Sequence, residues 1–335
     1  MADAITIRSN GFAEMASTKA EWHHSHTNHA IMTADATREE WIAAAGMDWR
    51  IQRSKVRYAT QAGQGFDGFA EMPEMHVLMR SDTKAPLGLV SDKFKVVQPA
   101  QVFDWMHDLT ESAGFKMETA GTLFGGKKFW SLASIGDDCE IVPGDKVGGY
   151  LLLSTATDGS MATTGQFTTV RVVCNNTLTM ALGNKHETRA KISHRSTFNP
   201  DTMKAKLGMA HEQFAHFKHA ALKLANKAVS RSDAAELALR LLAPKSLGDI
   251  SHATESDILK VTESRGYGSI MALFEGQGKG ALLDGVNGTA WGFLNAVTEY
   301  ADHHARTTSA EHRMQSAWFG AGAELKEKAV DLLTA

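Results

Sequence analysis

The chain has 335 residues, of which 43% are hydrophobic and 22% are charged. This composition provides enough apolar side chains for a buried core and excludes a wholly disordered chain. The apolar runs are too short for a signal peptide or a membrane span, and the two cysteines do not form the C-x-x-C pair of a thiolate zinc site or a disulfide framework. We therefore expect a cytoplasmic protein with no membrane partner.

The positive charge is concentrated in one segment. The net charge is −3, but residues 171–231 contain eleven Lys and Arg against three Asp and Glu, a local net charge of +8. Phosphate groups are bound by clustered cations, so this segment predicts a polyanion-binding face on an otherwise acidic protein. A solvated helix face with ordinary loop lysines would give the same count.

The chain is expected to begin with a flexible N-terminal arm at residues 1–37, because this stretch is rich in Ala, Ser, Thr and His without clean periodicity. Thr37 and Glu40 then have the spacing of a capping box, which predicts a helix that ends at Gly46.

The strand predicted next, at residues 49–58, carries a basic stripe. Arg53, Lys55 and Arg57 are two residues apart, so they project from the same face of the sheet. Trp49 and Tyr58 flank them, and single-stranded nucleic acid binders combine cations with aromatic rings in this way. Outward-facing charges on a sheet are also common without any ligand.

Further β elements follow in the first half. Residues 75–80 and 87–97 are predicted strands, and residues 99–113 a helix that starts at a proline. Two hairpins are predicted after it, one pairing 115–123 with 127–135 and one pairing 148–157 with 167–173.

Helical patterns dominate the second half. The predicted elements are a short helix at 176–182, an extended piece at 191–196, a long helix at 200–229, and helices at 232–242, 255–263, 269–274, 289–306 and 322–333. The predicted fold class is therefore α+β, with an antiparallel β-sheet-rich N-terminal half that contains inserted helices and a mainly α-helical C-terminal half. After the arm at 1–37, we predict a β-rich α+β domain at 38–197 and a mainly helical region at 198–335 packed on it, with a boundary that rests on composition alone.

An ordered set of short motifs resembles the phage/plasmid-like protein family, an uncharacterised family of phages, prophages and plasmids. The motifs are LVSDKFKVVQ at 89–98, AGTLFGG at 120–126, TDGS at 157–160, VRVVCNNTL at 170–178, AWG at 290–292, NAVTEY at 295–300 and WFG at 318–320. None is specific alone, and the resemblance rests on their order over residues 38–330.

The resemblance implies a context and little mechanism, because the family has no settled activity. It implies a protein of a mobile genetic element in a bacterial host cell, encoded among genes for DNA replication and recombination. The chain departs from the family pattern in having Thr157 in place of His and Asn175 in place of Gln. If that His is catalytic in relatives, this chain lacks the chemistry.

Arg171, Asn175 and Asn176 form the first candidate site, at an expected strand-to-helix junction. Free backbone N–H groups and the Arg171 cation could hold a phosphate or carboxylate there. In the alternative interpretation, Asn176 caps the helix and Arg171 makes a structural ion pair.

Two further candidates complete the set. Asp158, Gly159 and Ser160 are a hairpin-turn signal or, alternatively, a phosphate or metal loop. The run at residues 185–195 is a second nucleic-acid candidate, because its four cations repel each other unless an anion neutralises them. These cations are Lys185, Arg189, Lys191 and Arg195.

The motifs of common enzymes are absent from the sequence. It has no G-x-S-x-G, no Walker loop and no dinucleotide fingerprint, and the histidines at 23–29 have no cysteine partner. We therefore expect no metal site, no cofactor and no catalytic residues.

The hypothesis that follows is a non-enzymatic, homo-oligomeric nucleic-acid-binding protein that binds single-stranded DNA or anneals strands in recombination or replication. The alternative is an oligomeric interaction protein that docks on a host or phage protein through Trp291, Trp318 and Phe319. An enzyme acting on nucleic acid, with Asp92 or Asp158 as a metal ligand, ranks last because no carboxylate cluster accompanies them.

Overall fold

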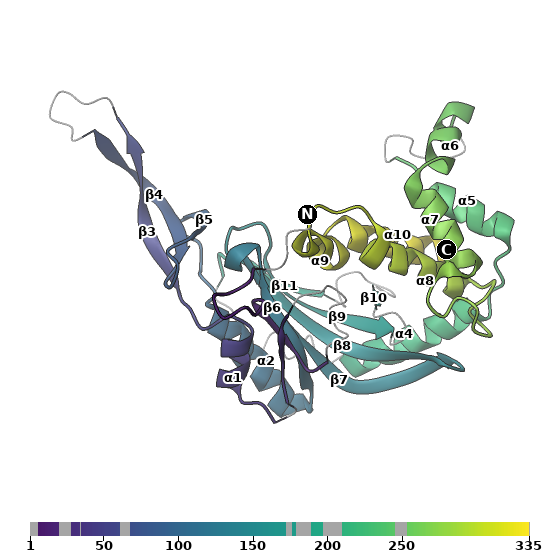
Figure 1. The fold of residues 1–335 in the computed structure, drawn as a ribbon, viewed down its shortest axis with the longest axis horizontal. Helices are drawn as coiled ribbons and strands as arrows, with labels where there is room; N and C mark the ends of the chain where they lie inside the picture. The colour runs from purple at the N-terminus through teal and green to yellow at the C-terminus, as the bar shows by residue number, and fades with distance from the viewer. Residues whose placement is uncertain are drawn as a thin grey trace.

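The computed structural model describes residues 6–19, 28–33, 35–60, 68–171, 176–178, 189–196, 210–244 and 253–334. Within these ranges, strands dominate the N-terminal half and helices the C-terminal half, which confirms the predicted α+β class. The strands form two sheets of different size, and Figure 1 shows the smaller one projecting from the rest of the molecule.

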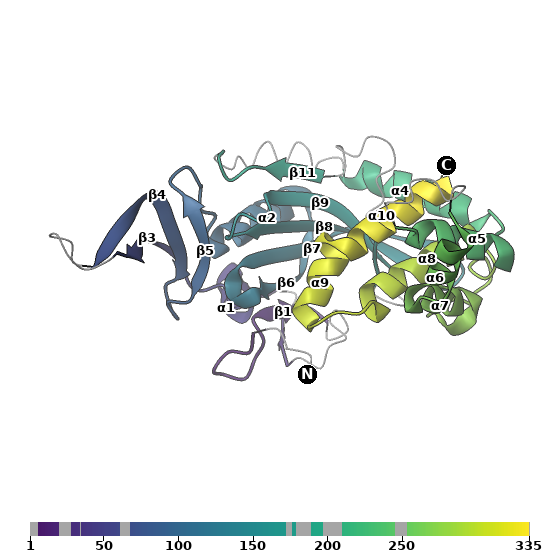
Figure 2. The ribbon, with the colours of Figure 1, turned by 90° about the horizontal axis from the view of Figure 1, so that it is seen from above.

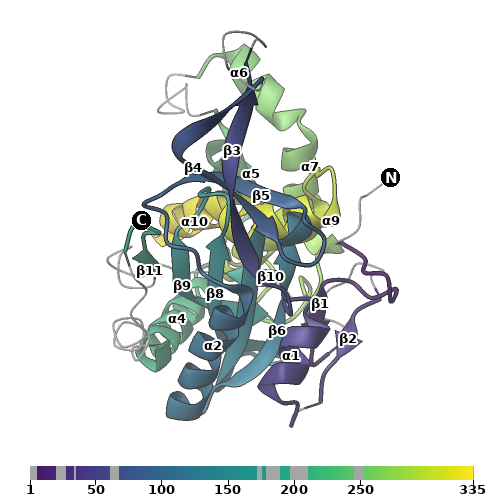
Figure 3. The same cartoon turned by 90° about the vertical axis from the view of Figure 1, so that its left-hand side faces the viewer.

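The smaller sheet is antiparallel, with the order β3-β4-β5. Its strands are β3 (Ile51–Ala59), β4 (Phe69–Arg80) and β5 (Pro86–Ser91). Between the partners of Lys55 and Val56, β4 has three extra residues that include Pro73, and such a bulge bends a strand and tolerates a proline. Beyond the bulge only β3 and β4 pair, and this distal ribbon is largely exposed (Figure 3).

The larger sheet has the order β10-β9-β8-β7-β6-β1-β2, and β11 pairs with the same edge of β9 as β10 does. Its strands are β1 (Met15–Ser17), β2 (Ala30–Ile31), β6 (Lys116–Leu123), β7 (Lys128–Val142), β8 (Asp145–Ala156), β9 (Thr163–Arg171), β10 (Asn176–Leu178) and β11 (Arg189–Ile192). The two predicted hairpins are β6–β7 and β8–β9. Nearly every residue of β8 and β9 is buried, as in strands that are covered on both faces.

Helices cover both faces of the larger sheet. On one face, α2 (Pro99–Ala113) and α4 (Ala210–Ala225) contribute Met106 and Phe217 to an apolar cluster that contains Phe129 of β7. On the other face lies α9 (Ala310–Phe319), as Figure 2 shows. The rings of its Trp318 and of Trp130 meet edge to face, with centroids 4.9 Å apart. The sheet is therefore the central layer of the fold.

The helix predicted after Thr37 is α1 (Arg38–Ala44), and its capping box with Glu40 is confirmed. The remaining helices are α5 (Arg231–Leu242), α6 (Glu255–Thr262), α7 (Arg265–Ala272), the π-helical turn η5 (Leu273–Gln277), α8 (Ala290–Glu299), the π-helical turn η6 (Tyr300–His304) and α10 (Ala321–Thr334). The sequence predicted all of these helices except α9, whose polar sequence lacks a clear apolar stripe. Among the helices of the described ranges, none is both long and apolar enough to cross a lipid bilayer.

The N-terminal residues differ from the predicted flexible arm. Met15–Ser17 form the buried strand β1, which pairs with β6. The close approach depends on Gly121 of β6, where a Cβ atom would lie 2.8 Å from the carbonyl oxygen of Glu14. A short strand of this kind is too brief to show the period-two pattern by which strands are predicted.

The segment after β9 also differs from its prediction. Asn176–Leu178 were expected to begin a helix, but they form β10, because the edge of β9 offers backbone partners. Residues 179–182 of that predicted helix and residues 200–209 of the long predicted helix lie outside the described residues, and the part of the long helix that is described is α4.

Candidate nucleic-acid interface

A basic cleft is lined by residues of the smaller sheet, of α2 and of the β11 edge of the larger sheet. Its volume is about 270 Å³. Arg53 comes from β3, Lys95 from the connection between β5 and α2, and His194 from the segment after β11. The other lining residues are Val96, Val97, Gln101, Trp105, Thr163, Ile192, Ser193 and Ser196. The cleft thus unites segments that are far apart in the sequence.

Contacts around His194 hold the two sides of the cleft together. The Lys95 backbone N–H donates to the His194 carbonyl oxygen at 2.5 Å, and His194 Nδ1 lies 3.2 Å from the Lys95 carbonyl oxygen. His194 Nε2 lies 3.0 Å from the Met161 carbonyl oxygen, so both ring nitrogens face backbone carbonyl oxygens. The Phe94 ring stacks on His194, with centroids 4.4 Å apart and planes at 17°.

Arg53 and Lys95 are exposed cations in the lining of the cleft, and three further exposed cations stand within two residues of a lining residue in the sequence: Lys93, Lys191 and Arg195. Within the described part of the chain, none of the five pairs with a carboxylate, and the Arg53 guanidinium donates to the Phe94 carbonyl oxygen. The adjacent acid, Asp92, faces away from these cations toward β4, where His76 Nδ1 lies 2.8 Å from its carboxylate. Uncompensated cations at such close spacing attract anions, and phosphates above all.

The other two cations of the β3 stripe are neutralised. Lys55 Nζ and Arg57 Nη2 lie 2.7 Å and 3.1 Å from the Glu71 carboxylate of β4. The hydrogen bond from Lys55, followed by that from Arg57, lowers the pKa of Glu71. The three cations of the stripe therefore fall into two groups. Arg53 lies at the cleft, and the other two form an ion-pair cluster on the exposed ribbon.

Asp158, Gly159 and Ser160 form the turn between β8 and β9. The Ser160 N–H donates to Asp158 Oδ1 at 2.9 Å, and Gly159 has φ +76°, which favours glycine. That N–H is already used within the turn, which supports the turn interpretation over a phosphate loop. The turn also packs on β5, since a Cβ atom on Gly88 would lie 2.6 Å from Asp158 Cα.

Arg171 belongs to the interior of the fold. Its side chain is 4% exposed, and its Nε lies 2.5 Å from Oδ1 of the fully buried Asp145. Asp145 Oδ2 also accepts a hydrogen bond from Trp291 Nε1 at 2.8 Å, and Arg171 Nη1 donates to the Lys279 carbonyl oxygen at 2.8 Å. Contrary to the predicted nucleic-acid contact, Arg171 is thus not at the surface. A buried charge requires such partners, and the pair links β8 and β9 to α8.

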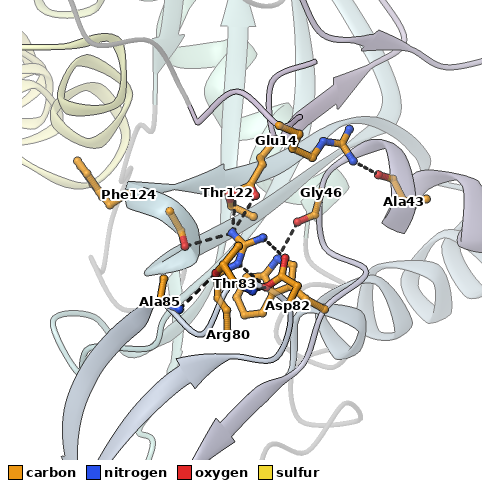
Figure 4. A network of polar contacts seen from close by, with 12 residues as sticks. Glu14, Ala43, Gly46, Arg80, Asp82, Thr83, Ala85, Thr122 and Phe124 are labelled. Carbon is orange, nitrogen blue, oxygen red and sulfur yellow. Dashed lines mark hydrogen bonds and ion pairs between the residues drawn. The ribbon is translucent and has the colours of Figure 1, made fainter. Parts of the chain in front are cut away.

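A buried network around Arg80 attaches the smaller sheet to the larger one (Figure 4). Arg80 ends β4 and is 5% exposed, and its guanidinium lies 2.8 Å from both the Glu14 and the Asp82 carboxylates. Glu14 also accepts a hydrogen bond at 2.6 Å from the hydroxyl of Thr122 on β6. The Trp49 ring packs on the cation, with its centroid 4.3 Å from Arg80 Cζ. This network fixes the sheet that carries one wall of the cleft.

Residues 86–318 match a family described as a domain of unknown function, DUF932. This is more than half of the chain. The protein belongs to the DUF932 family. Searches of the curated proteins and of the solved structures found no match.

The DUF932 region begins at the first residue of β5 and ends within α9. It contains Lys95 and His194 of the cleft, whereas Arg53 and the ribbon of β3 and β4 precede it. It also spans the boundary predicted near residue 197, and helices from both sides of that boundary pack on the same sheet.

Several predicted site residues of this DUF932 protein cannot be placed. Lys185 and Asn175 lie outside the described residues. Of Arg189 and Asn176 only the backbone is described, in β11 and β10 respectively.

Sequence reasoning missed several residues of the cleft. Lys93 and Lys95 lie within the motif at 89–98. Their two positive charges in that motif were the signal that could have identified this segment. His194 and Trp105 give no such signal, because they meet the cleft only through the packing of β11 and α2.

The structure also bears on the candidate metal ligands. Among the described residues, no group of three His, Cys, Asp or Glu side chains could hold a metal ion. The Asp92 carboxylate lies beside His76, and the Asp158 carboxylate accepts a hydrogen bond from the Ser160 N–H within its own turn.

Proposed function

We propose that this DUF932 protein binds single-stranded nucleic acid and does so without catalysing a reaction. The main support is that two exposed cations from distant segments, Arg53 and Lys95, line one cleft, and that the exposed Arg195 stands in the sequence between two of its lining residues, His194 and Ser196. None of the three has a carboxylate partner among the described residues. Phosphates would neutralise these cations and release counterions on binding.

The rings of the cleft favour an unpaired strand over a duplex. Phe94 and His194 form a half-buried stack at its rim, and Trp105 lines it. Flat side chains beside cations suit bases that are free to stack, whereas a base within a duplex must first be extruded. A cleft of about 270 Å³ also suits one base rather than a base pair.

The biological setting is a further part of the proposal. The ordered motifs that resemble the phage/plasmid-like family support a protein of a mobile genetic element that acts in the cytoplasm of a bacterial host. Single-stranded DNA is then the expected ligand, strand annealing in recombination or replication the expected role, and a homo-oligomer the expected assembly.

The alternative of a protein-docking role loses one of the three anchors on which it depends. Trp291 is 1% exposed and lies in the core. Trp318 and Phe319 pack on each other, and Trp318 also packs on Trp130. Trp291 is therefore not available as an interface anchor, whereas Trp318 and Phe319 are half-buried and keep part of their surface exposed.

Fluorescence anisotropy of a labelled single-stranded oligonucleotide and its duplex, at low and near-physiological salt, tests the proposal. We expect the single strand to bind more tightly, with an affinity that falls steeply as salt rises. The triple variant Arg53→Glu, Lys95→Glu, Arg195→Glu should lose this binding whatever the oligonucleotide sequence.

The matched control is Lys223→Glu, which reverses one exposed charge on α4, away from the cleft. It should bind the oligonucleotide as the unchanged protein does. Binding that is absent, that does not respond to salt, or that survives the triple charge reversal would contradict the proposal.

A further inference from the structure

The polar side chains of the basic cleft are mostly hydrogen-bond donors. Arg53 and Lys95 bring a guanidinium and an ammonium group, which donate hydrogen bonds and cannot accept them. The described lining contains no Asp or Glu side chain. The Thr163 hydroxyl already lies 2.9 Å from the hydroxyl of a neighbouring threonine, and the Ser193 hydroxyl already accepts a backbone N–H at 3.2 Å. Free donors therefore outnumber free acceptors among the described lining side chains.

Backbone carbonyl groups beside the cleft are occupied as well. The Phe94 carbonyl oxygen accepts a hydrogen bond from the Arg53 guanidinium. The Lys95 carbonyl oxygen faces His194 Nδ1 at 3.2 Å, and the His194 carbonyl oxygen accepts the Lys95 N–H at 2.5 Å. The Ser193 carbonyl oxygen accepts a further backbone N–H at 2.9 Å. A ligand group that must donate hydrogen bonds therefore finds few partners in the cleft.

Gln101 adds two further donors, and their direction is fixed by a backbone contact. Gln101 is the third residue of α2, lines the cleft and is exposed. Its Oε1 accepts the Gln98 N–H at 2.8 Å, as a residue that caps a helix does. Because that backbone group can only donate, the amide oxygen faces it and the NH₂ group lies on the other side of the amide. This NH₂ group has no partner among the described residues.

The side chain of Gln98 holds this arrangement to β3. Its Oε1 accepts the Ile51 N–H at 2.8 Å, and its Nε2 donates to the Ile51 carbonyl oxygen at 3.2 Å. Ile51 precedes Arg53 by two residues on the same strand. A short chain of hydrogen bonds therefore positions the Gln101 amide relative to Arg53, so its N–H donors are in place before a ligand binds.

A cleft with this surplus of donors suits a base that has acceptors and no amino group. Adenine, cytosine and guanine each carry an exocyclic amino group, which loses its hydrogen bonds to water on burial and then needs acceptors. Thymine and uracil carry two carbonyl oxygens and no amino group. The cost of an unpaired donor therefore falls on the three bases that carry an amino group.

We propose that the basic cleft selects thymine or uracil over the other bases, and that the Gln101 NH₂ group donates to one of their carbonyl oxygens. This inference rests on the single-strand binding proposed above. It also goes beyond that proposal, because cations alone bind phosphates whatever the base sequence.

Fluorescence anisotropy with three labelled homopolymer strands of equal length tests the inference. The strands consist of thymidine, deoxyuridine and 5-methyldeoxycytidine. The first and the third differ only where a carbonyl and a ring N–H are replaced by an amino group and a bare ring nitrogen. We expect the thymidine and deoxyuridine strands to bind alike, and about tenfold more tightly than the 5-methyldeoxycytidine strand, whose amino group lacks an acceptor.

Gln101→Glu tests the residue that reads the base. A glutamate at this position still accepts the Gln98 N–H, so α2 keeps its cap, but a carboxylate replaces the NH₂ group. The added negative charge weakens binding to all three strands, so the readout is the ratio of two Kd values. We expect the preference for thymidine over 5-methyldeoxycytidine to fall from about tenfold to about twofold or less.

Lys223→Glu is again the control and should keep the full preference, with urea unfolding confirming that both variants are folded. Equal affinity of the unchanged protein for the thymidine and 5-methyldeoxycytidine strands would overturn the base preference and leave the single-strand proposal in place. A preference that Gln101→Glu does not change would overturn the role of Gln101. Absence of binding to all three strands would overturn the single-strand proposal, and this inference with it.

Discussion

Two strand cations of this protein, Arg171 on the larger sheet and Arg53 on the smaller one, have opposite environments. On the larger sheet, Arg171 points into a layer covered by helices, and it is buried against Asp145 at 2.5 Å. On the smaller sheet, Arg53 has no carboxylate partner among the described residues and remains exposed at the cleft. The layer over a sheet therefore decides whether a strand cation stabilises the fold or is available to a ligand.

Removal of the buried carboxylate should give the largest effect. Asp145→Ala leaves the Arg171 guanidinium and the Trp291 N–H without their partner in the interior, which should lower the free energy of unfolding by about 3–5 kcal/mol. Urea denaturation followed by tryptophan fluorescence measures the change.

The matched comparison is an ion pair of similar length at the surface. Arg231 Nε lies 2.6 Å from Glu275 Oε1, but the Arg231 side chain is 82% exposed. Arg231→Ala should therefore cost far less stability than Asp145→Ala, because an exposed ion pair is already solvated and is screened by salt. Equal losses from Asp145→Ala and Arg231→Ala would contradict the role given to the covering layer.

The covered sheet should also protect a thiol. Burial raises the pKa of Cys139 on β7 from its usual 9.0 to about 11, because the thiolate is disfavoured in an apolar layer. In a Cys174→Ser variant, in which Cys139 is the one remaining cysteine, a thiol reagent should modify the folded protein at least about a hundredfold more slowly than the unfolded chain. Similar rates of Cys139 modification in the folded protein and the unfolded chain would show that the helices do not shield this part of the larger sheet from the reagent.

The smallest effect is expected at the junction of the two sheets. The hydrogen bond from Arg80 lowers the pKa of Asp82 from 3.8 to about 2, although the Asp82 side chain is 44% exposed. A carboxyl whose folded pKa is depressed adds stability above its unfolded pKa and loses it as the pH falls through the folded value. Asp82→Asn should thus cost about 1 kcal/mol or less above about pH 4.

The pH dependence supplies the check on that pair. Urea unfolding of the unchanged protein and of Asp82→Asn should differ most near neutral pH, and the difference should shrink as the pH approaches about 2. A difference that grows on acidification would mean that Asp82 is not held as an anion by Arg80.

Local signals in the sequence predicted much of the fold. The capping box at Thr37 and the turn at Asp158 are each formed within a few residues, and both are present as expected. Strands β1 and β10 were missed because they are short, and because β1 exists through pairing with the distant strand β6 and β10 through pairing with the edge of β9.

The candidate site was predictable only in part, for the same reason. The stripe on β3 correctly placed three cations on a strand, but its division depends on Glu71, which lies across the strand pair. The burial of Arg171 depends on Asp145 and on the residues near Lys279, which are distant in sequence. Side-chain partners of this kind cannot be read from local periodicity.

The central claim is that the unpaired cations of the cleft, rather than the paired cations of the ribbon, bind nucleic acid. The most direct test is the salt dependence of single-strand affinity in two double variants. The cleft variant carries Arg53→Ala with Arg195→Ala, and the ribbon variant carries Lys55→Ala with Arg57→Ala. In the cleft variant, the slope of the logarithm of the binding constant against the logarithm of the salt concentration should fall in magnitude by about 1.4, because each lost phosphate contact removes about 0.7. In the ribbon variant the slope should change little. An equal or larger fall in the ribbon variant would contradict the account.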